Sequence, residues 1–280
     1  MISDGNLRSV SLTLADVVGI FEDRYDPAWA ESWDAVGLVC GHPEAEVRRV
    51  LFAVDPLAEV ADEALDWGAD LIVTHHPLLL RAVHGVPATT PKGRLVHRLI
   101  TSGVALFTAH TNADVADPGV SDALARAVGL SGPLRPLSPS SEDPRRGLGR
   151  VGELPAPLTL RDFAAGAAKG LPATAAGLRV AGDPDSLVRT VAVCGGAGDS
   201  LLGVARAVGA DVYLTADLRH HPASEFREAG ATALVDAAHW ATEWPWLRDA
   251  ASLLGETNVE TRISTAVTDA WTFRSVEGST

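Results

Sequence analysis

The stretch GADLIVTHH at residues 68–76 recurs as GADVYLTAD at residues 209–217. In both copies a Gly-Ala-Asp turn leads into a short apolar run with a threonine at the same offset. Each copy also follows an apolar run and an amphipathic stretch, VRRVLFAVD and PLAEVADEALDWG in the first, LVRTVAVCGG and AGDSLLGVARAVG in the second. A strand, a helix and a second strand in this order predict a βαβ unit with parallel strands. The sequence therefore predicts an α/β protein with an internal repeat.

The repeat extends to a third predicted strand in each copy. VALFTAHTNAD at 104–114 and TALVDAAHWATE at 232–243 both end in Ala-His-x-x-x-acid. The stretch between the copies, SGPLRPLSPSSEDPRRGLGR, is rich in Pro, Ser and Gly, which indicates a linker. The alternating tail VETRISTAVTDAWTF predicts a last strand for the second half. The expected organisation is a first α/β half at 1–130, a linker at 131–150 and a second α/β half at 151–280.

Composition limits the classes of protein to consider. No apolar run approaches the roughly 20 residues that span a bilayer, and MISDGNLRSV has neither the basic region nor the apolar core of a secretory signal. We therefore expect a cytoplasmic protein without membrane contact. The net charge of −13 disfavours nucleic acid as a partner. The two cysteines, Cys40 and Cys194, suit a reducing compartment, so any metal site would use histidine and carboxylate.

Four histidines follow predicted apolar strands, at the strand ends where open α/β sheets bind ligands: His75, His76, His110 and His239. A single histidine at such a place is more often a structural residue, but the whole set with nearby carboxylates favours a metal site. Neighbouring side chains in an extended chain point to opposite faces. We therefore expect His75 and His76 to serve one ion each.

Two histidines have an acid four residues later, His110 with Asp114 and His239 with Glu243. Residues four apart are separated by about 13 Å in a strand but by only about 5–6 Å on one face of a helix. We therefore place each histidine at a strand end and each acid in the helical turn beyond it. This number of N and O ligands indicates two ions about 3.5–4 Å apart, with Glu243 well placed to bridge them. Such ligands suit zinc, iron, manganese or similar divalent ions.

Three further features have two explanations each. His220 and His221 can line a pocket or begin a solvated helix. GGAGD at 195–199 can cradle phosphate on its backbone N–H groups or form a tight turn between strand and helix. Tryptophans near the predicted site are expected in the core or at a subunit contact. They are Trp29, Trp33, Trp240, Trp244 and Trp246.

The chain resembles the dinuclear-metal-centre family whose members are often named GTP cyclohydrolase 1 type 2 homologues, also called the Nif-three-like family. The resemblance rests on ESWDAVGLVCG, GADLIVTHHPLLL, AHTNADVADPGVSDALA, VCGGAGDS, GADVYLTADLRHH and VDAAHWATEWP, which cover most of residues 29–247. It implies two similar halves with a metal pair between them, two divalent ions per chain, and a ring-shaped homohexamer. The connecting stretch is too short for the middle domain that some members insert.

The resemblance also implies the metal ligands, which are His75, His76, Asp114, His239 and Glu243. His110 matches a family histidine beside the site, as a ligand or as a neighbour of the ligands. The chain departs from the family at Ala35, where Asn is usual, and at Ala216, where Gly is usual. Neither position is a predicted ligand.

These features predict a metal-dependent hydrolase that acts on a nucleotide or a related small molecule, GTP cyclohydrolase-like by resemblance. His110, His220 and His221 are the candidates for proton transfer or for holding a phosphate. The alternative is a non-catalytic metal-binding or regulatory assembly protein.

Overall fold

The structure, a computed structural model, describes residues 11–275 and divides into two compact units. Unit 1 comprises residues 11–28, 32–110 and 250–266, and unit 2 comprises the remaining described residues. The segment MISDGNLRSV lies outside the described residues. No helix within residues 11–275 is long and apolar enough to cross a membrane.

Unit 1 is built on a five-stranded sheet in the order β13-β4-β5-β6-β2. The strands β4, β5, β6 and β13 are parallel, and β2 runs antiparallel to β6. Two short strands, β1 and β3, form a separate antiparallel pair. The bounds are β1 (Leu12–Thr13), β2 (Gly37–Cys40), β3 (Glu46–Val47), β4 (Arg49–Ala53), β5 (Leu71–Thr74), β6 (Ala105–Thr108) and β13 (Glu260–Ile263).

The expectation that the C-terminal strand joins the second half was wrong. β13 pairs with β4 of unit 1, with Glu260 opposite Arg49 and Ile263 opposite Phe52. Arg49 Nε also donates to Glu260 Oε2 at 3.1 Å. Alternation of apolar and polar residues predicts a strand, but it does not identify the strand's neighbour, because any open sheet edge offers the same backbone groups.

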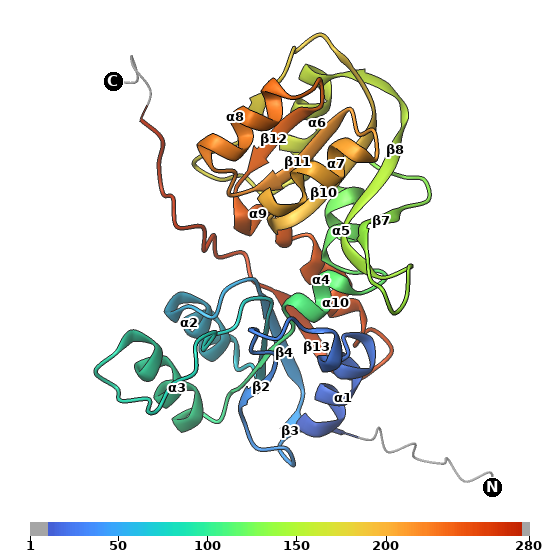
Figure 1. Ribbon diagram of the computed structural model, residues 1–280. Coiled ribbons are helices and arrows are strands. Elements are labelled where there is room, and N and C mark those ends of the chain that lie inside the picture. Colours follow the sequence, from blue (N-terminus) through green and yellow to red (C-terminus); the bar gives the residue numbers. More distant parts are fainter. Residues whose placement is uncertain (1–10, 276–280) are drawn as a thin grey trace, which may run out of the picture. The chain divides into compact units, whose positions relative to one another are not determined.

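Helices cover both faces of the unit 1 sheet (Figure 1). The helices α2 (Ala58–Trp67) and α3 (Pro91–Thr101) pack on the face that carries Leu51, Ile72 and Leu106. The helix α1 (Leu14–Arg24) lies on the other face, where the Phe21 ring centroid is 6.0 Å from that of Phe52. Side chains alternate between the faces along each strand, so both faces of these strands are buried.

Unit 2 is built on a six-stranded sheet in the order β7-β8-β10-β11-β12-β9. Its central strands β10, β11 and β12 are parallel, and the outer ones are antiparallel to their neighbours. The bounds are β7 (Arg135–Pro139), β8 (Gly147–Thr159), β9 (Arg179–Ala181), β10 (Leu187–Ala197), β11 (Val212–Ala216) and β12 (Ala233–Ala237).

The segment predicted as a linker, 131–150, contains β7 and the start of β8. Its prolines are compatible with a strand because β7 lies at the edge of the sheet. On the outer side of an edge strand a missing N–H group removes no hydrogen bond between strands. Composition alone therefore does not separate a linker from a proline-containing edge hairpin.

The helices of unit 2 also cover both faces of its sheet. The helices α5 (Val120–Ala127) and α6 (Leu160–Gly170) pack with Val191 and Leu214, whereas α7 (Leu202–Ala207) and α8 (His220–Glu228) pack with Ala192 and Tyr213. The remaining helices are short. They are α4 (Thr111–Val115), α9 (His239–Glu243) and α10 (Trp246–Ser252), with 3-10 turns η1 (Pro27–Trp29) and η2 (Asp199–Leu201).

The repeated Gly-Ala-Asp turn has the same structure in both units. Gly68 and Gly209 both have a φ of 74°, a left-handed conformation that glycine adopts without a steric penalty. Asp70 Oδ2 accepts the backbone N–H groups of residues 48 and 49 at 2.8 and 2.9 Å. Asp211 Oδ2 accepts those of residues 189 and 190, both at 2.8 Å. The glycine thus lies where the helical segment before the strand ends, and the aspartate bonds this turn to the backbone of the neighbouring strand.

Candidate metal centre

Three histidines of unit 1 come together at the carboxyl ends of β5 and β6. His75 and His76 directly follow β5, and His110 lies two residues after β6. One ligand atom of each lies within 4.8 Å of the other two. His75 is fully buried and the other two are half-buried. Three imidazole nitrogens this close together form a donor set that fits zinc, iron or a similar divalent ion.

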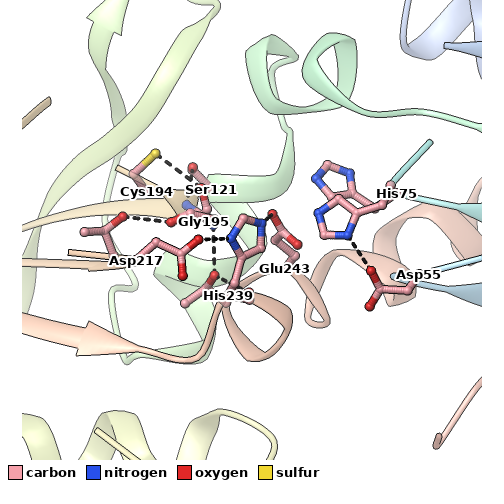
Figure 2. Close-up of polar contacts among 12 residues, drawn as sticks. Asp55, His75, Ser121, Cys194, Gly195, Asp217, His239 and Glu243 are labelled. Carbon is pink, nitrogen blue, oxygen red and sulfur yellow. Dashed lines mark hydrogen bonds and ion pairs between the residues drawn. The ribbon is translucent and has the colours of Figure 1, made fainter. Parts of the chain in front are cut away.

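The Nδ1 atom of each of these histidines is already used within unit 1. A carboxylate or carbonyl oxygen only accepts hydrogen bonds, so Nδ1 carries the proton and the lone pair remains on Nε2. Metal-binding histidines are commonly oriented in this way. The bonds are His75 Nδ1 to the Ala109 carbonyl oxygen at 2.9 Å, His76 Nδ1 to Asp55 Oδ1 at 2.7 Å, and His110 Nδ1 to Asp34 Oδ1 at 2.8 Å. Figure 2 shows the bond that Asp55 makes.

The charge state of His110 follows from its surroundings. Burial and the neighbouring His75 lower the pKa of His110 to about 4, against the opposing effect of Asp34. The imidazole of His110 is therefore neutral near pH 7. A neutral imidazole can bind a metal ion or accept a proton.

Unit 2 contains a histidine between two carboxylates. His239 and Glu243 both lie in α9, and His239 Nε2 is 2.9 Å from Glu243 Oε1. This confirms the expected common face of this pair. His239 Nδ1 is 2.7 Å from Asp217 Oδ2, and Figure 2 shows the imidazole with one carboxylate on each side. His239 is thus oriented by an aspartate, as His76 and His110 are.

The two carboxylates decide the charge of His239. Burial by itself lowers the pKa of His239, but Glu243 and Asp217 outweigh it and raise this pKa to about 11. In the metal-free chain a proton therefore lies on Nε2 beside the Glu243 carboxylate. A metal ion that binds Nε2 must displace this proton.

Gly196 of the GGAGD stretch fits closely against this pair. A Cβ on Gly196 would lie 2.6 Å from Glu243 Oε1 and 3.1 Å from His239 Nε2, and Gly196 has a φ of 65°. The N–H of Gly195 donates to Ser121 Oγ at 3.2 Å, and that of Gly196 to Thr242 Oγ1 at 2.9 Å. Because these N–H groups are used internally, the contacts support the tight-turn explanation rather than a phosphate cradle.

Unit 2 also contains the other predicted site residues, Asp114, His220 and His221. Asp114 is half-buried in α4, and its charge, together with the larger effect of burial, raises the pKa of Cys194 to about 12. His220 and His221 are the first two residues of α8, and both are exposed. Neither belongs to a group of potential metal ligands within residues 11–275.

Sequence reasoning missed the three aspartates that orient the histidines. Asp34 lies in the WDAVG motif, and Asp55 follows β4 by two residues. Asp217 directly follows β11 and occupies the position of His76 in the repeat. An acidic residue at a strand end is the signal that could have identified Asp55 and Asp217.

The fold and the site define an α/β protein with histidine and carboxylate groups that can hold a metal ion. The family model Duf34/NIF3 (NGG1p interacting factor 3) matches residues 12–270, so the chain belongs to this family. This confirms the resemblance inferred from the motifs.

Individual relatives agree with this assignment. A Streptomyces coelicolor protein named GTP cyclohydrolase 1 type 2 homolog is 58% identical, over 92% of this chain and 93% of the relative. NIF3-like protein 1 of Drosophila melanogaster is 32% identical, over 79% of this chain and 75% of the relative. A solved Bacillus cereus protein related to NIF3 has a TM-score of 0.85 at 25% identity, covering 95% of this chain and 100% of that one.

Proposed function

We propose that the chain binds two divalent metal ions through His75, His76, Asp114, His239 and Glu243, and that it hydrolyses a nucleotide or a related small molecule. The observation that carries the proposal is the orientation of the histidines. Each of the four at strand ends has its Nδ1 bonded to an acceptor, which makes Nε2 the atom that would bind an ion; on His239 the ion would replace the proton between Nε2 and Glu243.

Bound divalent ions supply Lewis acidity, which lowers the pKa of water and polarises a substrate oxygen. His110 is neutral near pH 7 and is the candidate to accept a proton or to add a ligand. His220 and His221, exposed on α8, remain candidates for holding an anionic group of the substrate. The name of the Streptomyces coelicolor relative supports a nucleotide as the substrate class. Self-association as a homohexamer in the cytoplasm belongs to the same proposal.

The proposal is tested first by metal content. Elemental analysis of the full-length protein after purification and reloading should find about two ions per chain, and well under one ion would contradict the metal site. Light scattering should give the mass of a hexamer, and a monomer would contradict self-association.

Activity is tested separately on the metal-loaded protein with nucleoside triphosphates, phosphoesters and cyclic amides. A Glu243→Ala variant should lose turnover, whereas Glu228→Ala, at an exposed position in α8, should retain it. If the wild type turns over no substrate faster than Glu243→Ala while retaining its metal, the hydrolase proposal fails and a non-catalytic metal-binding role is favoured.

A further inference from the structure

A large aromatic side chain is exposed beside the histidine group of unit 1. Trp33 is 57% exposed, and its ring centroid lies 6.0 Å from that of His110 at an interplanar angle of 78°. Trp240 and Trp246 are buried, as expected for core tryptophans, but Trp33 is not. Of the two expected explanations, the core one therefore does not apply to Trp33, which leaves a subunit contact or a role beside the histidine group.

Trp33 is held in place by its neighbour in the chain. The Asp34 side chain is fully buried and accepts a hydrogen bond from His110 Nδ1 at 2.8 Å. The same oxygen of Asp34 accepts the N–H of Ala35 at 2.7 Å. The aspartate that orients His110 thus also fixes the backbone next to Trp33. The indole is presented on a short, anchored turn.

The geometry points to Trp33 as a stacking platform for a planar N-heteroaromatic ring of the substrate, such as a purine base. Aromatic side chains stack on nucleobases whatever the base, because every base has a π-face. Stacked aromatic rings have centroids about 4.5–7 Å apart. A ring stacked on Trp33 would lie close to His110, because the two side chains are themselves in contact. This inference rests on the proposed function and adds to it Trp33 as the residue that would hold the base of the nucleotide.

The test is equilibrium binding to the metal-loaded full-length protein, with guanosine triphosphate and inorganic tripolyphosphate as probes. Both probes carry the phosphates, but only the first carries a base. Trp33→Ala should weaken binding of guanosine triphosphate about tenfold and leave tripolyphosphate within about twofold. Trp33→Phe should retain most of the affinity. Trp271→Ala is the matched control, since Trp271 is 71% exposed in unit 2 and should change neither value.

Three results would overturn the inference. They are equal weakening of both probes, no weakening of either, or a wild type that binds guanosine triphosphate no more tightly than tripolyphosphate. A lower molar mass of Trp33→Ala in light scattering with unchanged binding would show that the ring packs at a subunit contact instead. Metal content and turnover are measured independently, so an absence of hydrolysis with normal Trp33-dependent binding contradicts only the hydrolase proposal.

Discussion

Asp217 orients His239 from a backbone conformation that few residues adopt. Asp217 Oδ2 lies 2.7 Å from His239 Nδ1. Asp217 has a φ of 56° and is the one non-glycine residue with a positive φ within the described part of the chain. Aspartate and asparagine tolerate this left-handed conformation better than most residues. The unusual backbone is consistent with a requirement for the carboxylate at this position.

Asp217→Asn is expected to weaken metal binding by about 10- to 100-fold, because it removes the charge that orients and polarises His239. Asparagine keeps the shape of the side chain and tolerates the same φ, so the fold should be retained. Competition titration with a chelator measures the affinity. Asp143→Asn is the control, since Asp143 pairs with Arg145 rather than with a histidine. Equal affinities of Asp217→Asn and wild type would contradict the role of Asp217.

Metal affinity is expected to rise with pH by about tenfold per unit between pH 6 and 8. The pKa of His239 is raised to about 11 in the metal-free chain, so a proton must leave Nε2 throughout this range. Calorimetric titration in two buffers of different ionisation enthalpy should detect the released proton. An affinity independent of pH, after correction for the chelator, would show that His239 is not a ligand.

Acid is expected to destabilise the metal-free protein through His110. The pKa of His110 is about 4 in the folded state against 6.5 for an ordinary histidine, so the unfolded state binds more protons between these values. The contribution is fully present above pH 6.5 and is lost as pH falls to 4, by up to about 3 kcal/mol. Urea unfolding across this range measures it. His110→Gln should flatten the dependence, whereas His97→Gln, which alters an exposed helical histidine, should not.

Gly196→Ala is expected to disrupt the candidate centre, because the new Cβ would collide with Glu243 and crowd His239. Gly209→Ala separates this effect from backbone strain, since Gly209 has a similarly positive φ but open space at its Cβ position. Both should lose about 1–2 kcal/mol of stability from the left-handed backbone. Only Gly196→Ala should also weaken metal binding, measured by the same chelator competition. Equal metal affinities of the two variants would contradict the close fit.

Asp70 and Asp211, the aspartates of the repeated turn, are each expected to stabilise only the sheet of their own unit. Asp70→Asn should increase hydrogen exchange in the unit 1 sheet, and Asp211→Asn should do so in the unit 2 sheet, because each loses charge-assisted bonds to two N–H groups. Each loss should cost about 1–3 kcal/mol of local stability. Increased exchange in both sheets from either single substitution would contradict the local role.

The sequence predicts most of the sheet cores because their strands are short apolar runs with a repeated turn between strand and helix. It also predicts the histidine group, since residues at the ends of adjacent parallel strands necessarily lie near one another. It does not predict the bonds from Asp34 to His110 or from Asp55 to His76, which join residues 76 and 21 positions apart. Nor does the sequence predict that β13 pairs with β4, because the alternation of apolar and polar residues in a strand does not identify its partner strand.

The pairing of β13 with β4 sets an order of events during synthesis. Residues 111–249 of unit 2 separate the last segment of unit 1, residues 250–266, from its earlier segments, so all strands of the unit 2 sheet are made before β13. Until residue 263 leaves the ribosome, one edge of β4 has no partner strand. An unpaired edge of this kind is a template for wrong pairing. The nascent chain therefore depends on its last strand to close a sheet that began to form with its first hundred residues.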